Sequence, residues 1–323
     1  MIKDIDSIFT PVIGRIGKYE ELLRESLSTN SPLIYEITKH LFSRPGKRLR
    51  PGLIFLSAGK TDNPSVVYAA VAIELIHVAT LLHDDVIDQS DTRRGVESVN
   101  HRWNNLVSVL MGDYLFAKSF GLLVQSQSQN LLDIFSKATE RVATGELNQV
   151  YFTGNFDIDE KDYLNVISDK TASLLACAAE AGMICNGADP QKLTAMRRYG
   201  ENLGMAFQIT DDLLDLVGET TKTGKQLGSD IREGWATLPL IYALRNGGRA
   251  HKNRLINLYK DTFEPEEFQT VVDIVRDSGG IDYAGQKAQS YSDRAKEAVE
   301  QIPGLEYKDR LIELADFAVY RDK

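Results

Sequence analysis

Apolar residues recur at helical spacing through much of the chain. From residue 65 to 88 they follow the three- and four-residue intervals of a broad helical face. No proline interrupts the chain between Pro64 and Pro190, so long helices are allowed there. Similar patterns predict further helices over residues 107–124, 131–150, 173–185 and 193–217.

Strand patterns are weak by comparison. Alternating runs of Val, Ile and Thr bounded by hairpin turns, which are typical of strands, do not occur in the sequence. No flexible linker or repeat period divides the chain. We therefore predict an all-α fold in which residues 1–323 form a single domain. Loops are predicted around residues 42–50, 89–95, 153–159, 186–190, 218–234 and 247–248.

The composition is that of an ordinary globular protein, with 43% hydrophobic and 26% charged residues. A net charge of -9 argues against nucleic acid as a partner. The apolar run that ends at Ile73 is stopped by Glu74, far short of the roughly 20 residues that cross a membrane. We therefore expect no integral membrane segment. The acidic start of the chain also differs from a signal peptide.

The two cysteines, Cys177 and Cys185, both lie in the predicted helix over residues 173–185. Eight residues of helix separate them by about 12 Å, which is too far for a disulfide. We expect both to be buried free thiols in a reducing compartment. The expected localisation is therefore cytoplasmic.

Two similar acidic motifs follow apolar helical segments. Residues 81–88 read LLHDDVID and residues 208–215 read QITDDLLD. In each motif the first and last Asp are four residues apart, on one face of a helix. Oxygen-only ligands favour Mg²⁺ or, as a substitute, Mn²⁺. One such motif also occurs on solvated helix ends, but two copies favour a metal site whose halves face each other across a shared cavity.

Basic residues stand close to both motifs. Three cations fall within residues 45–51, Arg93 and Arg94 follow the first motif, and Lys225 follows the second. Arg and Lys side chains suit phosphate oxygens. Each one alone could form an ordinary surface ion pair. Their joint placement beside the acids favours binding of a Mg²⁺-bridged diphosphate.

With these motifs the sequence resembles the all-trans polyprenyl diphosphate synthases, including octaprenyl diphosphate synthases. The resemblance implies a bundle of long antiparallel helices around a central cavity, the isoprenoid synthase type of fold, usually as a homodimer. The segments that carry it are 46–51 (GKRLRP), 82–88 (LHDDVID), 91–95 (DTRRG), 112–114 (GDY), 170–171 (KT), 207–215 (FQITDDLLD) and 224–225 (GK).

The resemblance also implies a role for each polar group. The Mg²⁺ ligands on the allylic side are Asp84, Asp85 and Asp88, and those on the opposite wall are Asp211, Asp212 and Asp215. Arg93 contacts the allylic diphosphate, and the diphosphate of isopentenyl diphosphate is bound by Lys47, Arg50, His77 and Arg94. The residues near the departing diphosphate and the allylic cation are Lys170, Thr171, Gln208 and Lys225.

The reaction class follows from the same residues. No Ser-His-Asp grouping, Rossmann glycine pattern or P-loop occurs in the sequence, so no covalent protein nucleophile is expected. The implied activity is a prenyltransferase reaction. The double bond of isopentenyl diphosphate attacks an allylic cation derived from farnesyl or geranylgeranyl diphosphate, and the departed diphosphate takes up the released proton.

His77 has a competing interpretation. It ends a Glu-x-x-His sequence that begins at Glu74, the spacing used in di-iron helical bundles. That fold normally requires two such motifs, and the chain has one. The position of His77 two helical turns before Asp84 favours a diphosphate-binding role over that of a core histidine.

Product length depends on the residues one turn below the first motif. Ala79 and Thr80 are both small there, which predicts an open hydrocarbon tunnel and a product of about C30–C50 for a quinone side chain. The resemblance favours Ala79 as the gatekeeper, whereas the angle around the helix favours Thr80.

Four alternatives are weighed at this stage. A shorter-chain geranylgeranyl or farnesyl diphosphate synthase would use the same chemistry. A terpene cyclase typically carries Asn/Asp-x-x-Ser/Thr-x-x-x-Glu as its second motif, whereas this chain has Asp211, Asp212 and Asp215 there. A non-catalytic subunit of a heteromeric synthase would usually have lost site residues, and all are present. A purely structural bundle would leave six clustered carboxylates unexplained.

Overall fold

The protein was analysed as a computed structural model that describes residues 4–43, 46–93, 95–218, 227–260 and 267–321. The first half contains α1 (Ile5–Phe9), the 3-10 turn η1 (Thr10–Val12), α2 (Ile13–Ser26), α3 (Pro32–Leu41), α4 (Leu49–Ala58), α5 (Ser65–Ile87), β1 (Thr92–Arg93), β2 (Val96–Glu97), α6 (Val99–Arg102), α7 (Asn105–Gln125) and α8 (Gln129–Phe152). The second half contains α9 (Glu160–Ile167), the π-helical turn η2 (Ser168–Ala172), α10 (Ser173–Asn186), α11 (Pro190–Val217), α13 (Ser229–Arg232), α14 (Leu238–Asn246), α15 (Gly248–Lys260), α16 (Phe268–Asp277), α17 (Gly280–Glu300) and α18 (Lys308–Tyr320).

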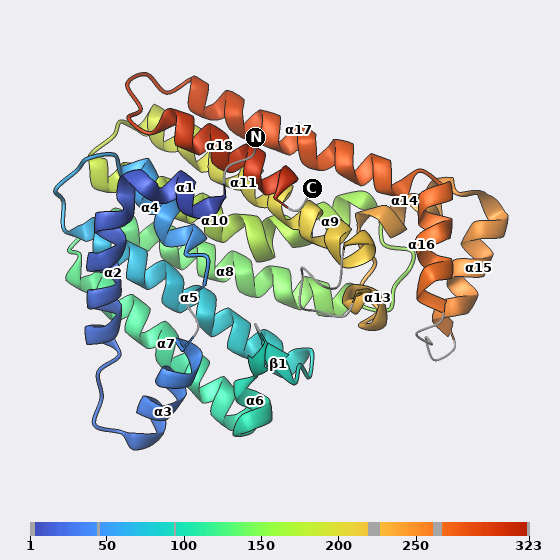
Figure 1. The fold of residues 1–323 in the computed structure, drawn as a ribbon, viewed down its shortest axis with the longest axis horizontal. Helices are drawn as coiled ribbons and strands as arrows, with labels where there is room; N and C mark the ends of the chain where they lie inside the picture. Colours follow the sequence, from blue (N-terminus) through green and yellow to red (C-terminus); the bar gives the residue numbers. More distant parts are fainter. Residues whose placement is uncertain (1–3, 44–45, 94, 219–226, 261–266, 322–323) are drawn as a thin grey trace.

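The long helices form a bundle in which most of them lie roughly alongside one another (Figure 1). α5 packs against α7, and α10 packs against α4, α8 and α11. On the far side, α11 packs against α17. α10 is the central element, because nearly all of its residues are buried. This arrangement confirms the predicted all-α fold.

Helix ends follow the local chemistry of the sequence. α11 starts with Pro190 after Asp189, whose side chain accepts a hydrogen bond from the Lys192 amide at 3.0 Å. α10 ends at Gly187, a left-handed residue that closes the helix. Cys177 and Cys185 are buried free thiols on α10, as expected.

Several segments differ from the sequence prediction. α4 already begins at Leu49, inside the predicted 42–50 loop, because Arg48 adopts a left-handed conformation and Pro51 is tolerated in the first helical turn. The predicted 89–95 loop contains β1, which pairs with β2 in a two-stranded antiparallel hairpin. The helix predicted from residue 173 is continuous with η2 and α9, which precede it.

Two helices bear on the expectation that the chain has no integral membrane segment. By length and composition alone, α5 and α7 are each apolar enough to cross a membrane, although no single apolar run is long. α5 is mostly buried among α2, α4, α7 and α10, so its apolar character is explained by the core of the bundle. α7 is covered on one side only.

Candidate active site

The first acidic motif lies at the C-terminal end of α5. Helix C-termini carry partial negative charge, so carboxylates there require nearby cations. Arg93 of β1 supplies one, because its Nε donates to Asp85 Oδ1 at 2.8 Å. The hairpin turns the chain back so that this arginine reaches the helix end, and Asn100 Nδ2 donates to the Asp85 carbonyl oxygen at 3.0 Å. Asp85 is thus buried but paired.

Asp84 faces a second set of charges, on α8 and η2. Lys170 Nζ donates to Glu146 Oε2 at 2.8 Å, and both side chains interact electrostatically with Asp84. Burial raises the pKa of Asp84 to about 8, and the Glu146 and Asp88 carboxylates add to the shift although Lys170 opposes it. Burial alone would lower the pKa of Lys170, but Asp84 and Glu146 raise it overall, so this ammonium stays charged.

The second motif lies near the end of α11 and is held by a chain of hydrogen bonds. Thr171 Oγ1 donates to Gln208 Oε1 at 2.8 Å, and Gln208 Nε2 donates to Asp212 Oδ1 at 2.8 Å. Tyr163 of α9 donates its hydroxyl proton to Asp212 Oδ2 at 2.5 Å. Burial raises the pKa of Asp212 to about 7 against these donors, and the Asp211 and Asp215 charges raise it further.

The other two acids of this motif have different partners. Arg321, at the end of α18, forms an ion pair with Asp211 and stacks its guanidinium carbon 3.6 Å from the centre of the Phe207 ring. Asp215 accepts hydrogen bonds from the Ser229 hydroxyl at 2.8 Å and from the Asp230 amide at 3.1 Å. Asp215 thereby holds the start of α13 against α11.

The turn η2 connects the two motifs. Lys170 and Thr171 are adjacent in this π-helical turn, so their side chains point in different directions. Lys170 therefore reaches the Asp84 side while Thr171 reaches the Asp212 side through Gln208. One helical turn thus interacts with the surroundings of both motifs, between which the sequence predicts a shared cavity.

The remaining predicted residues lie at varied distances from this turn. Lys47 is exposed just before α4, Arg50 lies in the first turn of α4, and His77 is half-buried on α5. α4 packs against α5, the helix that carries His77. Arg94 and Lys225 lie outside the described residues.

The two residues expected to control product length differ in exposure. Ala79 has 0% accessible surface, so it borders no open space in this structure. Thr80 is only partly buried, and its hydroxyl donates to the His77 carbonyl of the same helix at 2.8 Å. The observed exposure agrees with the angle around the helix, which favours Thr80.

A metal fits this donor set. Among the described residues, no three acidic, His or Cys side chains are clustered as a ready metal site, and arginines form ion pairs with Asp85 and Asp211. Asp84 Oδ1, however, is buried with no hydrogen-bond partner among the described groups. A buried carboxylate oxygen in that state is suited to a hard divalent cation.

Sequence reasoning missed three residues of the site. Glu146 is read from the sequence as one polar position of an amphipathic helix, although Gly145 before it was a signal of close packing. Tyr163 and Arg321 lie 49 and 110 residues from the acids that they contact. No local pattern could have assigned them.

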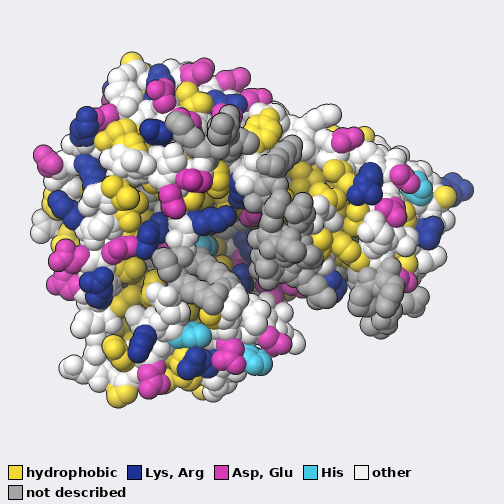
Figure 2. Space-filling model, in the orientation of Figure 1, with side chains coloured by type: hydrophobic (Ala, Val, Ile, Leu, Met, Phe, Trp, Pro, Cys, Tyr) yellow, Lys and Arg dark blue, Asp and Glu magenta, His cyan; other side chains and the backbone are white. Residues whose placement is uncertain are grey.

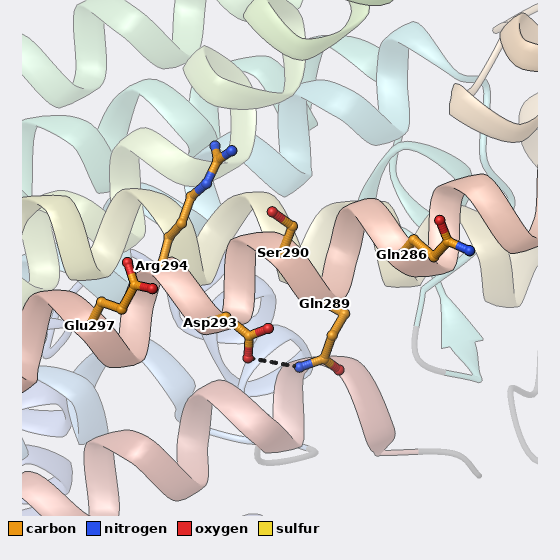
Figure 3. A pocket seen from close by; sticks show the side chains of 6 residues that line it. All are labelled: Gln286, Gln289, Ser290, Asp293, Arg294 and Glu297. Atoms are coloured by element: carbon orange, nitrogen blue, oxygen red, sulfur yellow. Dashed lines mark hydrogen bonds between the residues drawn. The ribbon is translucent and has the colours of Figure 1, made fainter.

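The surface agrees with a basic opening. In Figure 2, Lys and Arg side chains gather around a hollow near the centre of the face shown. A separate shallow pocket lies along α17, lined by Gln286, Gln289, Ser290, Asp293, Arg294 and Glu297 (Figure 3). It is formed by one helix, and it contains none of the predicted site residues.

Comparisons with known proteins identify the family. The profile of the polyprenyl synthetase family matches residues 31–275. An all-trans-nonaprenyl-diphosphate synthase (geranyl-diphosphate specific) of Rhodobacter capsulatus is 36% identical over 317 residues, 97% of each chain. The octaprenyl diphosphate synthase of Escherichia coli is 35% identical over 302 residues, 93% of each chain.

A solved structure gives the same result in three dimensions. A polyprenyl synthase from Caulobacter crescentus, complexed with calcium and isoprenyl diphosphate, is similar to this chain with a TM-score of 0.94 and 36% identity. The alignment covers 100% of this chain and 99% of the other. Fold, acidic motifs and sequence identity over the full length agree: the chain belongs to the polyprenyl synthetase family.

Proposed function

We propose that this protein is a Mg²⁺-dependent all-trans polyprenyl diphosphate synthase that adds isopentenyl diphosphate repeatedly to an allylic diphosphate. The observation that carries the proposal is η2, whose adjacent residues Lys170 and Thr171 contact the surroundings of both acidic motifs. A diphosphate bound between the motifs would meet a charged ammonium and an ordered hydroxyl from a single turn.

The chain's own residues prepare the departure of that diphosphate. Lys170 is kept protonated by the acids around it, so it supplies positive charge where the C–O bond breaks. Thr171 orients the Gln208 amide, which in turn fixes Asp212. Arg93, on its hairpin, pairs with Asp85 in this structure. When a diphosphate is bound, the guanidinium would pair with a diphosphate oxygen in place of the Asp85 carboxylate.

The metal would be held by Asp84, Asp85 and Asp88 on one wall and by Asp211, Asp212 and Asp215 on the other. When bound, Mg²⁺ supplies Lewis-acid stabilisation of the negative charge that develops on the leaving diphosphate. Lys47, Arg50, His77, Arg94 and Lys225 are assigned by family resemblance to the remaining diphosphate contacts.

The reaction needs no covalent bond to the protein. The allylic C–O bond breaks to give diphosphate and an allylic cation, and the double bond of isopentenyl diphosphate forms the new C–C bond. A proton then leaves for the released diphosphate, and the product is one isoprene unit longer. The apolar walls of the bundle exclude water from the cation.

The product is proposed to fall at about C30–C50. The relatives described above are named as nonaprenyl and octaprenyl diphosphate synthases. Thr80, small and partly accessible one turn below Asp84, supports an unblocked path for a long chain. We assign such a product to quinone side chains and the enzyme to the cytoplasm.

A homodimer is supported by an uncovered apolar face on α7 and α8. Leu106 and Leu110 of α7 are 67% and 57% exposed, and Leu147 and Tyr151 of α8 are 72% and 77% exposed. Large apolar side chains at this density on two neighbouring helices favour association with a second copy. Sedimentation equilibrium is expected to give twice the mass of one chain. Leu110→Glu is expected to shift the measured mass toward that of a single chain.

One incubation tests the activity itself. The purified protein is mixed with Mg²⁺, labelled isopentenyl diphosphate, and farnesyl or geranylgeranyl diphosphate, and the dephosphorylated products are sized by chromatography. Labelled products of six to ten isoprene units are expected. Labelled products that stop at four units when farnesyl diphosphate is the primer would replace the long-chain assignment with a short-chain one. No incorporation by the pure chain would favour a non-catalytic subunit.

A further inference from the structure

We propose that Arg141 of α8 is a positioning residue for the condensation reaction, because it fixes η2 and thereby aims Lys170 and Thr171. This inference rests on the proposed function, in which these two side chains face the departing diphosphate. Arg141 itself belongs to none of the motifs by which the family was recognised.

Arg141 contacts both residues that open η2. Its Nε donates to Asp169 Oδ1 at 2.7 Å, and its Nη2 donates to the carbonyl oxygen and the hydroxyl of Ser168 at 3.1 and 2.8 Å. Asp169 is the residue directly before Lys170. The guanidinium therefore holds backbone and side-chain atoms within two residues of the proposed catalytic pair.

Glu201 of α11 anchors the same group from the opposite side. Arg141 Nη1 and Nη2 donate to the two Glu201 carboxylate oxygens at 3.1 and 2.7 Å, and the Ser168 hydroxyl donates to Glu201 Oε1 at 2.6 Å. A bidentate arginine–carboxylate pair fixes direction as well as distance. α8, η2 and α11 are thus joined through one guanidinium.

The backbone of η2 requires such support. The Ser173 amide donates to the Ser168 carbonyl, the five-residue interval of a π-helix, in place of the tighter α-helical interval. Single π-helical turns are rare and recur at functional sites. The wider turn changes the direction in which Lys170 and Thr171 leave the helix.

Close packing on both sides leaves little room for adjustment. A Cβ at Gly145 of α8 would come within 2.4 Å of the Lys170 amide nitrogen. A Cβ at Gly204 of α11 would come within 2.4 Å of the Ala172 Cα. η2 therefore lies directly against two helix backbones, and the Arg141 cluster locks it in that position.

Arg141 acts through these neighbours and not on the substrate. Its hydrogen bonds all end on Ser168, Asp169 and Glu201, and none reaches an acid of either motif within the described chain. Glu146, five residues further along α8, contacts Lys170 directly. α8 thus supports the turn at two points, of which Arg141 is the more distant from the chemistry.

The test compares Arg141→Met and Arg141→Lys with wild type and with Lys137→Met. Lys137 lies on the same helix and forms an exposed ion pair with Asp133, so its variant controls for loss of a positive charge on α8. Arg141→Met is expected to lower kcat by roughly tenfold to a hundredfold, as a small misplacement of reacting groups does. KM for both diphosphates is expected to stay within about twofold, because the binding residues are untouched.

A second variant separates positioning from stability. Arg141→Met leaves the Asp169 and Glu201 carboxylates without their cation, which lowers the melting temperature. Adding Glu201→Gln removes that repulsion and is expected to restore the melting temperature while kcat stays low. If the double variant recovered both the melting temperature and kcat, Arg141 would serve stability only and the proposal would be overturned. Arg141→Lys keeps the positive charge but cannot form the bidentate pair with Glu201. Its kcat is expected to lie between those of wild type and Arg141→Met.

The outcomes also distinguish this proposal from the proposed function. If wild type forms no products, the function is wrong. If wild type is active and folded Arg141→Met has an unchanged kcat, the function stands and the positioning role is refuted. All assays are run well below the melting temperature of each variant, with helical circular dichroism recorded in the same buffer.

Discussion

Replacing Thr80 by tyrosine is expected to shorten the product. Thr80 is partly accessible on α5, and its only described hydrogen bond goes to a carbonyl of its own helix. A ring at this position would therefore extend from the partly accessible side of α5 without breaking a described hydrogen bond between helices. The ring would lie one helical turn below Asp84, so the Asp84 carboxylate could still bind the metal ion.

The magnitude follows from the length of α5. Four residues separate Thr80 from Asp84, about 6 Å along the helix axis, whereas the helix continues for about 22 Å from Thr80 to Ser65. A ring at Thr80 would thus leave the growing hydrocarbon chain only about the first fifth of the length of α5 between Asp84 and Ser65. Products from farnesyl diphosphate are expected to fall from about C30–C50 to near the geranylgeranyl size, with the first condensation retained.

Ala79→Tyr is the matched comparison. Ala79 has no accessible surface, so the added ring must displace packed neighbours, at a cost of about 1–3 kcal/mol in the free energy of unfolding. Reversed-phase chromatography of dephosphorylated products measures length, and urea unfolding measures stability. An unchanged product distribution from folded, active Thr80→Tyr would refute the argument from exposure. Shortening by Ala79→Tyr alone would return the gatekeeper role to Ala79.

Three further predictions concern the charged residues. Asp84→Ala or Asp211→Ala is expected to lower turnover by about a hundredfold or more while helical circular dichroism persists; wild-type activity that survives excess chelator would contradict the metal assignment. Lys47→Ala is expected to raise KM for isopentenyl diphosphate, a loss of about 1.5–3 kcal/mol of binding, and Arg93→Ala to act on the allylic substrate; steady-state kinetics with each substrate varied separates them, and equal effects on both would remove the distinction. Because the folded-state pKa of Asp84 is raised from 3.8 to about 8, metal-free protein binds an extra proton in this interval and loses stability as pH rises through it. Urea unfolding with chelator is therefore expected to show Asp84→Asn more stable than wild type at pH 8 and nearly equal to it at pH 4, and a constant difference would contradict the shift.

The chain's periodicity was sufficient to predict five of the long helices, α5, α7, α8, α10 and α11, but it did not predict α17. The spacing over residues 65–88 predicted α5 almost to its ends, and residues 193–217 predicted most of α11. Helical spacing is a local property, so it can be recognised in the sequence without knowing which helices pack together. The four-residue spacing within each acidic motif is local in the same way, which is why both motifs could be assigned from the sequence alone.

Short and irregular elements could not be predicted from the sequence in the same way. The two-residue strands β1 and β2 carry no alternating pattern, and α13 is only four residues long. The π-helical turn η2 has no sequence signature, because its wider hydrogen-bond interval is stabilised by neighbours on α8 and α11. The start of α4 at Leu49 likewise depends on the left-handed conformation of one residue, Arg48.

The partners of the acids were decided by tertiary structure. Arg321 meets Asp211 across 110 residues, Tyr163 meets Asp212 across 49, and Arg141 meets Glu201 across 60. Contacts at such separations depend on how helices pack side by side, and nothing in the local spacing specifies that. The sequence alone therefore determined which chemical groups the chain carries and on which helices. Only the packing of α5, α8 and α11 around η2 decided which of those groups meet.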